Sequence, residues 1–253
     1  MSQQRKSPTM QALINFLEFH SSVYGWDKTM KNLSYALPLA AKYLERRQVG
    51  DSPLPEALKQ MGSWFSMYRV GTRLAAGPFG LPAEIENLIN HSWYGGWKHP
   101  GIKRCVWLQS VMMLGYYPLE HLCWLGSVAP KLVKADLDKA SRISCVFWTL
   151  WLLLDIVATT LRFRELDEIE KELSKGRVLT PADKAMLARS RQACRLHLAR
   201  VLLFLPNAIH WTLPANHKYA LPETLVQVFG LGEGLVGTYS LAKGYSIACP
   251  HKV

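Results

Sequence analysis

The chain has 253 residues, of which 49% are hydrophobic and 19% are charged, and it contains nine Trp residues. This apolar load is gathered in clumps along the chain, which disfavours an ordinary water-soluble enzyme. The formal net charge of +11 suits either nucleic acid or an anionic membrane surface. The basic residues flank the apolar segments and do not gather among exposed aromatic residues, so no nucleic-acid partner is expected.

The N-terminal region, residues 1–104, has the periodicity of amphipathic helices. Residues 10–24 carry apolar side chains at helical spacing, and Gly25 is expected to end this first helix. A second helical pattern starts after Asp27, a candidate N-cap, and continues past Pro38, where a kink is expected.

The third helical pattern is amphipathic and basic, and a break at Gly77-Pro78 follows it. One face is apolar, and the cations lie off that face. Such a face either packs on neighbouring helices or inserts into a bilayer while its cations contact lipid phosphates. The apolar candidates for membrane binding are Leu58, Met61, Phe65 and Tyr68, and the basic candidates are Lys59, Arg69 and Arg73.

From residue 105 onwards the chain is predicted to be membrane-embedded, with three to four apolar membrane helices in residues 105–253. The strongest candidate is 143–161, whose nineteen residues would rise about 28 Å, nearly the ~30 Å of a hydrocarbon core. Between the apolar segments lies a charged helical hairpin, 162–195, expected to turn at Gly176 and Thr180-Pro181. The other candidates are 105–128, Leu196–Leu213 and Leu221–Ile247.

Three charged residues inside these apolar segments are singled out as intramembrane polar candidates: Glu120, Asp155 and Arg200. An ionisable group at bilayer depth is costly, so it usually faces a partner or a water-filled cavity. Asp155 and Arg200 are candidates to pair with each other. They would either fix the packing of two helices, which is the favoured interpretation, or line a polar pathway through the membrane.

The last apolar segment contains spaced glycines, and Gly230, Gly234 and Gly237 are predicted to let helices approach closely. The same glycines do not match a phosphate-binding loop, because the GxGxxG spacing fails and no strand precedes them. The spacings of His197, His210 and His217 match no recognised metal site. No cofactor, metal or catalytic constellation is predicted, and the chain is expected not to be an enzyme.

The order of these segments resembles the peroxin-11 family over roughly residues 12 to 247. GWDKTMKNLSYALPLAAKYL is similar to the opening helix of the family, and LKQMGSWFSMYRVGTRLAAGPFG to its basic amphipathic helix. YYPLEHLCWLGSVAPKL and the closing unit from LPNAIHW to LAKGY resemble its later segments. The matching residues are Lys28, Tyr35, Met67, Arg69, Gly71, Arg73, Tyr116, Glu120, His121, Trp124, Pro214, Leu221, Gly230, Gly234 and Gly237.

This resemblance implies an all-α protein of the peroxisomal membrane that self-associates and associates with paralogues. It implies elongation of the bilayer into tubules that a dynamin-like fission machinery cuts, so that peroxisomes proliferate. The family also implies a rival function as a pore for small metabolites. A third hypothesis, a membrane-embedded lipid enzyme, has no motif in the sequence to support it. Pro38 and the low number of cations in the amphipathic helix depart from the family pattern, which indicates a divergent, modulating paralogue of the fungal type.

Overall fold

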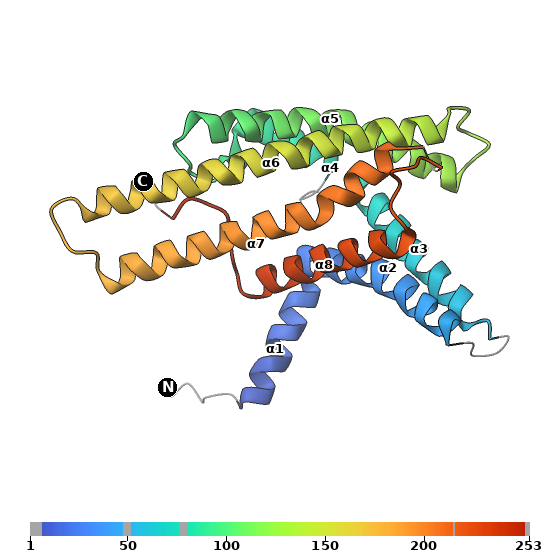
Figure 1. The fold of residues 1–253 in the computed structure, drawn as a ribbon, viewed down its shortest axis with the longest axis horizontal. Coiled ribbons are helices and arrows are strands. Elements are labelled where there is room, and N and C mark those ends of the chain that lie inside the picture. Colours follow the sequence, from blue (N-terminus) through green and yellow to red (C-terminus); the bar gives the residue numbers. More distant parts are fainter. Residues whose placement is uncertain (1–6, 48–51, 76–79, 215, 251–253) are drawn as a thin grey trace.

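The computed structural model describes residues 7–47, 52–75, 80–214 and 216–250. Within these ranges the protein is all-α, as predicted, with eight α-helices, one short 3-10 helix and no strand (Figure 1). The helices are α1 Pro8–Ser21, α2 Val23–Arg46, α3 Leu54–Ala75, α4 Gly80–Asn90, η1 Ser92–Tyr94, α5 Pro100–Val128, α6 Leu137–Ser174, α7 Pro181–Thr212 and α8 Glu223–Ala242.

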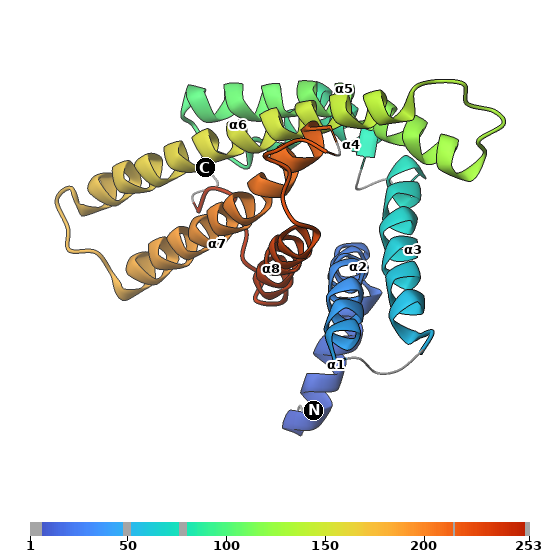
Figure 2. The same ribbon diagram turned by 45° about the vertical axis from the view of Figure 1, so that its right-hand side comes forward.

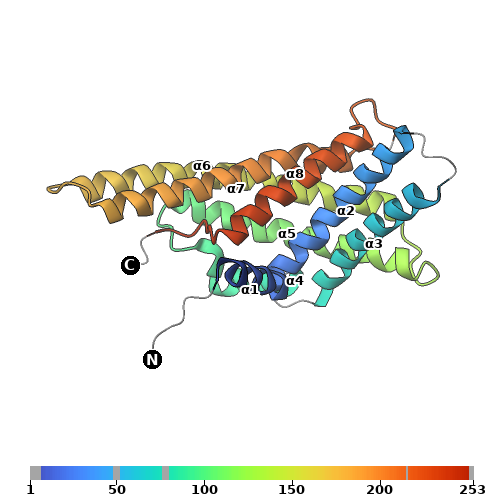
Figure 3. The same cartoon turned by 90° about the horizontal axis from the view of Figure 1, so that it is seen from below.

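The C-terminal helices form a layer in which α5 packs on α6, α6 on α7 and α7 on α8. The N-terminal helices join this layer in three places, because α2 packs against α8 and both α3 and α4 pack against α5. Helices α2 and α3 lie next to each other and cross α6 and α7 obliquely (Figure 3). Helix α1 packs against α2 and projects away from the other helices (Figure 2).

The predicted charged hairpin 162–195 is the far end of two long helices, α6 and α7, and not a separate unit. The turn between them is confirmed at the predicted place. Gly176 adopts a left-handed φ of 78°, and Thr180 closes a capping box with Asp183 at the start of α7. The apolar and charged halves of each helix therefore form one continuous rod.

The boundary between α1 and α2 differs from the prediction. Asp27 does not cap α2; instead Ser22 precedes the helix, and its hydroxyl accepts the backbone N–H of Gly25 at 3.0 Å. Gly25 lies inside α2 and does not end α1. A side chain would not fit at this position, because the carbonyl group of Phe19 occupies the place that a Cβ would need. Asp27 is consequently free to pair with Arg69 of α3.

Helix α2 continues through Pro38, and α3 packs closely at this point. A Cβ at Gly62 of α3 would lie 2.8 Å from Cδ of Pro38 and 3.2 Å from the carbonyl oxygen of Ser34. Proline donates no hydrogen bond to that carbonyl, and the absent side chain of Gly62 lets α3 cover the gap. The predicted break at Gly77-Pro78 lies outside the described residues.

Among the described helices, only α6 is long and apolar enough to cross a membrane. The three to four membrane helices expected from the sequence are therefore not confirmed as a number. The other apolar segments do form helices, in α5, α7 and α8, but polar residues such as Glu120, Arg200 and Glu233 interrupt them.

The glycines of α8 lie against α2 and α7. A Cβ at Gly230 would overlap the ring of Tyr35, and one at Gly234 would overlap Oδ1 of Asn32. At Gly237 it would lie 3.1 Å from Nε of Arg200. By contrast, a Cβ at Gly232 of the same helix would meet only Leu203, at 3.8 Å.

We expect Gly230→Ala to destabilise the protein by about 1–3 kcal/mol, because the added methyl group must displace Tyr35 from the interface between α8 and α2. Gly232→Ala is the matched control, and it should be neutral or stabilising because alanine favours helix by about 1 kcal/mol over glycine. Thermal unfolding of the detergent-solubilised variants measures both effects. Equal unfolding temperatures would contradict this packing.

Candidate functional site: buried ion pairs and exposed apolar faces

Asp155 lies on α6 and is 2% exposed. Its Oδ1 is 3.3 Å from Nη1 of Arg162, and its Oδ2 is 2.7 Å from Nε2 of His197 on α7. The expected pair between Asp155 and Arg200 is therefore wrong. Arg162 follows Asp155 by seven residues, two helical turns, and this spacing is the signal in the sequence that could have indicated the correct partner.

Arg200 instead pairs with Glu233, a buried residue of α8. Its Nε and Nη2 lie 3.0 and 2.8 Å from Oε1 of that carboxylate. The other carboxylate oxygen forms an ion pair with Lys31 of α2, whose ammonium also lies 3.8 Å from the ring centroid of Phe204. One acidic side chain thus connects α2, α7 and α8.

Glu120 of α5 connects the layer to α3. Nη2 of Arg73 lies 3.0 Å from Oε1 of Glu120, and the hydroxyl group of Tyr116 donates a hydrogen bond to the same oxygen. Each of the three polar candidates therefore forms an ion pair: Glu120 with Arg73, Asp155 with Arg162, and Arg200 with Glu233. Within the described ranges, no three His, Cys, Asp or Glu side chains gather as a metal site would require.

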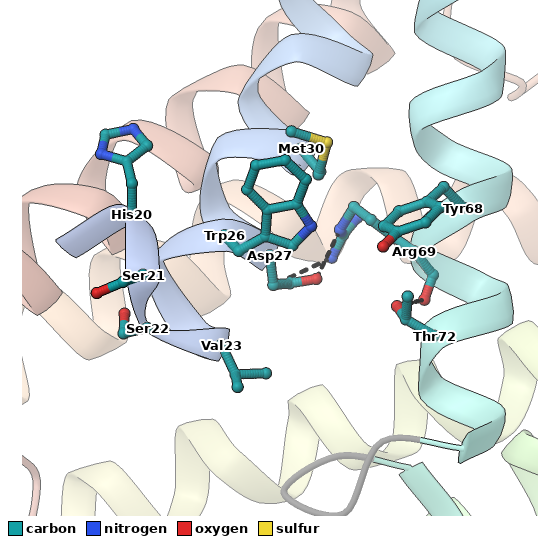
Figure 4. Close-up of a pocket in the computed structure, with 10 residues that line it drawn as sticks. All are labelled: His20, Ser21, Ser22, Val23, Trp26, Asp27, Met30, Tyr68, Arg69 and Thr72. Atoms are coloured by element: carbon teal, nitrogen blue, oxygen red, sulfur yellow. Dashed lines mark hydrogen bonds and ion pairs between the residues drawn. The ribbon is translucent and has the colours of Figure 1, made fainter. Parts of the chain in front are cut away.

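A cavity of about 330 Å³ lies between the α1–α2 junction and α3 (Figure 4). Arg69 points across it to Asp27, with Nε 2.8 Å from Oδ1. Burial acts to raise the pKa of Asp27, but the charge and hydrogen bonds of Arg69 lower it below the usual value. Trp26, Met30 and Tyr68 form the apolar part of the wall.

The predicted cations of α3 are therefore not arranged as expected. Arg69 and Arg73 turn into the molecule and form ion pairs, and Lys59 pairs with Glu45 at 2.6 Å. The apolar face is also rotated, because Gly62 fixes the side of α3 that packs on α2. Leu58 and Phe65 are half-buried. Four exposed apolar residues of the helix, which we call the α3 stripe, are Leu54, Met61, Trp64 and Tyr68.

The outer side of α6 is also apolar and exposed. Five of its residues recur every three or four positions and are each 41–50% exposed: Ile143, Val146, Leu150, Leu153 and Val157, the α6 stripe. Exposed apolar residues continue on the neighbouring helices at Leu202, Ile209, Leu225, Val228 and Leu235. Charged pairs inside and apolar side chains outside are the reverse of the usual distribution in a water-soluble domain.

Helix α1 adds a third exposed apolar surface. Four of its apolar side chains are each 50–56% exposed: Met10, Leu13, Phe16 and Leu17. The helix has a single charged residue, Glu18. About half of each of these side chains is left uncovered, and the helix that carries them projects from the remainder of the molecule (Figures 1 and 2).

The family model described as Peroxisomal biogenesis factor 11 (PEX11) matches residues 11–242 of the chain. The chain belongs to this family. The resemblance noted over residues 12 to 247 is thereby confirmed as far as residue 242, and PEX11 membership gives the protein a general role in peroxisome proliferation. PEX11 is a family of peroxisomal biogenesis factors and not of enzymes. Comparison with curated proteins and with solved structures finds no further match.

We expect Asp155→Asn to lower the stability of this PEX11 protein by about 3 kcal/mol, because it leaves Arg162 and His197 without a buried counter-charge. Asp138→Asn on the same helix is the control. The carboxylate of Asp138 is 75% exposed and pairs with Arg142 at the surface, so its loss should cost less than about 1 kcal/mol. Thermal unfolding in detergent separates the two, and equal losses would argue against a structural role of Asp155.

Proposed function

We propose that the protein resides in the peroxisomal membrane and elongates it, by inserting apolar helix faces into the bilayer and by self-association. The observation that carries this proposal is the reversed distribution of side chains. Ion pairs of Asp155 and Glu233 lie inside the helical layer, whereas the α6 stripe and its neighbours are exposed. In water such a surface would be unstable, and in lipid it needs no partner.

In this proposal α6 crosses the hydrocarbon core with its stripe facing the lipid tails, and α5, α7 and α8 accompany it. The charged ends of α6 and α7 then extend out of the bilayer into water. Asp167 and Glu170 at that end both pair with Arg191 near the surface, as expected for a solvated hairpin.

The α3 stripe and the apolar residues of α1 are proposed to lie in the interface of the bilayer. Trp64 is 75% exposed, although tryptophan normally finds cover or a membrane interface. A helix that enters only one leaflet expands that leaflet, which is how insertion would favour tubules. The net charge of +11 adds attraction to anionic lipid.

The proposed function includes homo-oligomers, association with paralogues and delivery of the tubule to a dynamin-like fission machinery. The exposed apolar faces of α1 and α3 supply surface for such contacts as well as for lipid. A pore for small metabolites is the alternative, and it would use the polar residues of the layer. Asp155 and Arg200 are already paired, which favours their role in packing.

We expect the protein to remain in the membrane pellet after extraction with alkaline carbonate, because the exposed α6 stripe would otherwise meet water. The measurement is the fraction of protein in pellet and supernatant of isolated peroxisomes. A soluble matrix enzyme serves as the released control. Release of most of the protein would contradict membrane embedding.

We expect Trp64→Glu to abolish or strongly reduce tubulation of anionic liposomes by the full-length protein, because a carboxylate replaces the most exposed aromatic residue of the α3 stripe. Ser63→Glu is the matched control, since Ser63 is also exposed and lies about 100° round the helix from Trp64. Electron microscopy of the liposomes scores tubules.

Equal tubulation by the two variants would remove the α3 stripe from the mechanism. Permeability is measured as the release of a small solute loaded into the same liposomes. Solute release without deformation of the liposomes would favour the pore over membrane elongation.

A further inference from the structure

A cavity of about 530 Å³ lies in the middle of the molecule, and helices α2 to α8 all contribute to its wall. Its volume falls within the ~300–1,000 Å³ of typical small-molecule sites. The wall combines charged residues with a large aromatic surface. The aromatic residues include Trp93, Tyr116, Trp148, Trp151 and Phe204.

Most charges on this wall are balanced by a direct partner. Three pairs account for them: Asp27 with Arg69, Arg73 with Glu120, and Asp155 with Arg162. Glu84 also faces the cavity, but burial raises its pKa to about 7, so at neutral pH it carries less than a full negative charge. Apart from the partly ionised Glu84, these groups leave no surplus of negative charge on the wall.

The remaining charges are unbalanced, because three cations share one carboxylate. Arg200 and Lys31 both pair with Glu233, and Lys28 lies one turn before Lys31 on the same helix. The ammonium group of Lys28 forms no ion pair or hydrogen bond with any described residue, and Asp27 beside it is held by Arg69. With both lysines protonated, the cluster therefore carries two positive charges in excess.

This surplus is costly in a buried place. Burial, together with the charge of Arg200, lowers the pKa of Lys28 to about 8, and burial lowers that of Lys31 to about 7 despite the charge of Glu233. Charged groups withdrawn from water are normally paired, so the half-buried ammonium group of Lys28, which faces the cavity, would be stabilised by a counter-charge there.

We propose that this cavity binds an organic anion, whose carboxylate or phosphate group contacts Lys28 and Arg200 while its apolar part lies against the aromatic wall. The anion would supply the missing counter-charge. A small inorganic ion would leave the aromatic surface uncovered, whereas an acyl carboxylate or a phospholipid-type phosphate satisfies both parts. This site goes beyond membrane elongation, which requires no ligand in the cavity.

Gly237 keeps room for the anionic group. A Cβ at this position would lie 3.1 Å from Nε of Arg200 and 3.4 Å from Cε of Lys28. The first of these distances is tight, so an alanine would force the guanidinium group of Arg200 to shift and would fill the space between the two cations. The glycine thus leaves space between the groups that would hold the anion.

The test uses full-length protein in a non-ionic detergent, titrated by calorimetry near neutral pH with four probes: decanoate, decyl phosphate, decyltrimethylammonium and inorganic phosphate. We expect one or both of the organic anions to bind at least about tenfold more tightly than the organic cation and than inorganic phosphate. A preference between decanoate and decyl phosphate would assign the head group as a carboxylate or a phosphate.

Lys28→Met should reduce the affinity for the preferred anion about tenfold, because it removes a cation but keeps a flexible side chain of similar length. The variant should fold, since no ion pair of Lys28 is broken, and thermal unfolding without ligand verifies this. Lys59→Met is the control, because Lys59 lies on α3 outside the cavity. Its anion affinity should equal that of the unchanged protein, whereas Gly237→Ala should bind more weakly.

Equal affinity for the organic cation, or unchanged affinity in Lys28→Met, would show only apolar partition and overturn the proposal. Inorganic phosphate that binds as tightly as decyl phosphate would overturn the assignment of an apolar part. Liposome tubulation by Lys28→Met is measured in parallel. Lost anion binding with retained tubulation separates this site from the proposed membrane function.

Discussion

The carboxylate of Glu233 is the point on which the arrangement of the helices depends. It binds Arg200 of α7 and Lys31 of α2, and these helices approach α8 only because Gly230, Gly234 and Gly237 lack side chains. Loss of the carboxylate would leave buried cations facing one another, at a cost well above that of a surface pair. The N-terminal helices are thus fixed to the C-terminal layer by electrostatics at a place that also requires small residues.

The same interior explains why the outside of the layer can be apolar. In water, a helix such as α6 would lose stability twice, because it withdraws charged groups from water and exposes apolar side chains such as Leu150 and Leu153. In lipid, the costs are reversed, because polar groups must face one another and apolar groups need no cover. In the proposed function, Asp155 with Arg162 and His197 on the inside and the α6 stripe on the outside form one consistent set.

Periodicity and composition were sufficient to predict an all-α chain, the turn at Gly176 and the order of segments that marks the PEX11 family. They were insufficient for the partners of charged residues. Glu233 and Lys31 are far apart in the sequence, and no local pattern links α2 to α8. The amphipathic face of α3 was misplaced for a related reason. Its helix has apolar residues on two sides, and contacts distant in the sequence, such as Gly62 with Pro38 and Arg69 with Asp27, determine which side is buried.

The ion pairs of the N-terminal helices bear on how insertion could deform a bilayer. A helix on a flexible tether enters one leaflet without transmitting force, because the tether relaxes. Helix α3 is held by Asp27 of α2 at Arg69 and by Glu120 of α5 at Arg73, so the α3 stripe keeps a fixed direction relative to α6. In the proposed function, a layer anchored by α6 and a stripe oriented by these two pairs act as a single wedge. The curvature then follows from the angle between α3 and the layer. The ion pairs of Arg69 and Arg73 set this angle, whereas the number of surface cations does not.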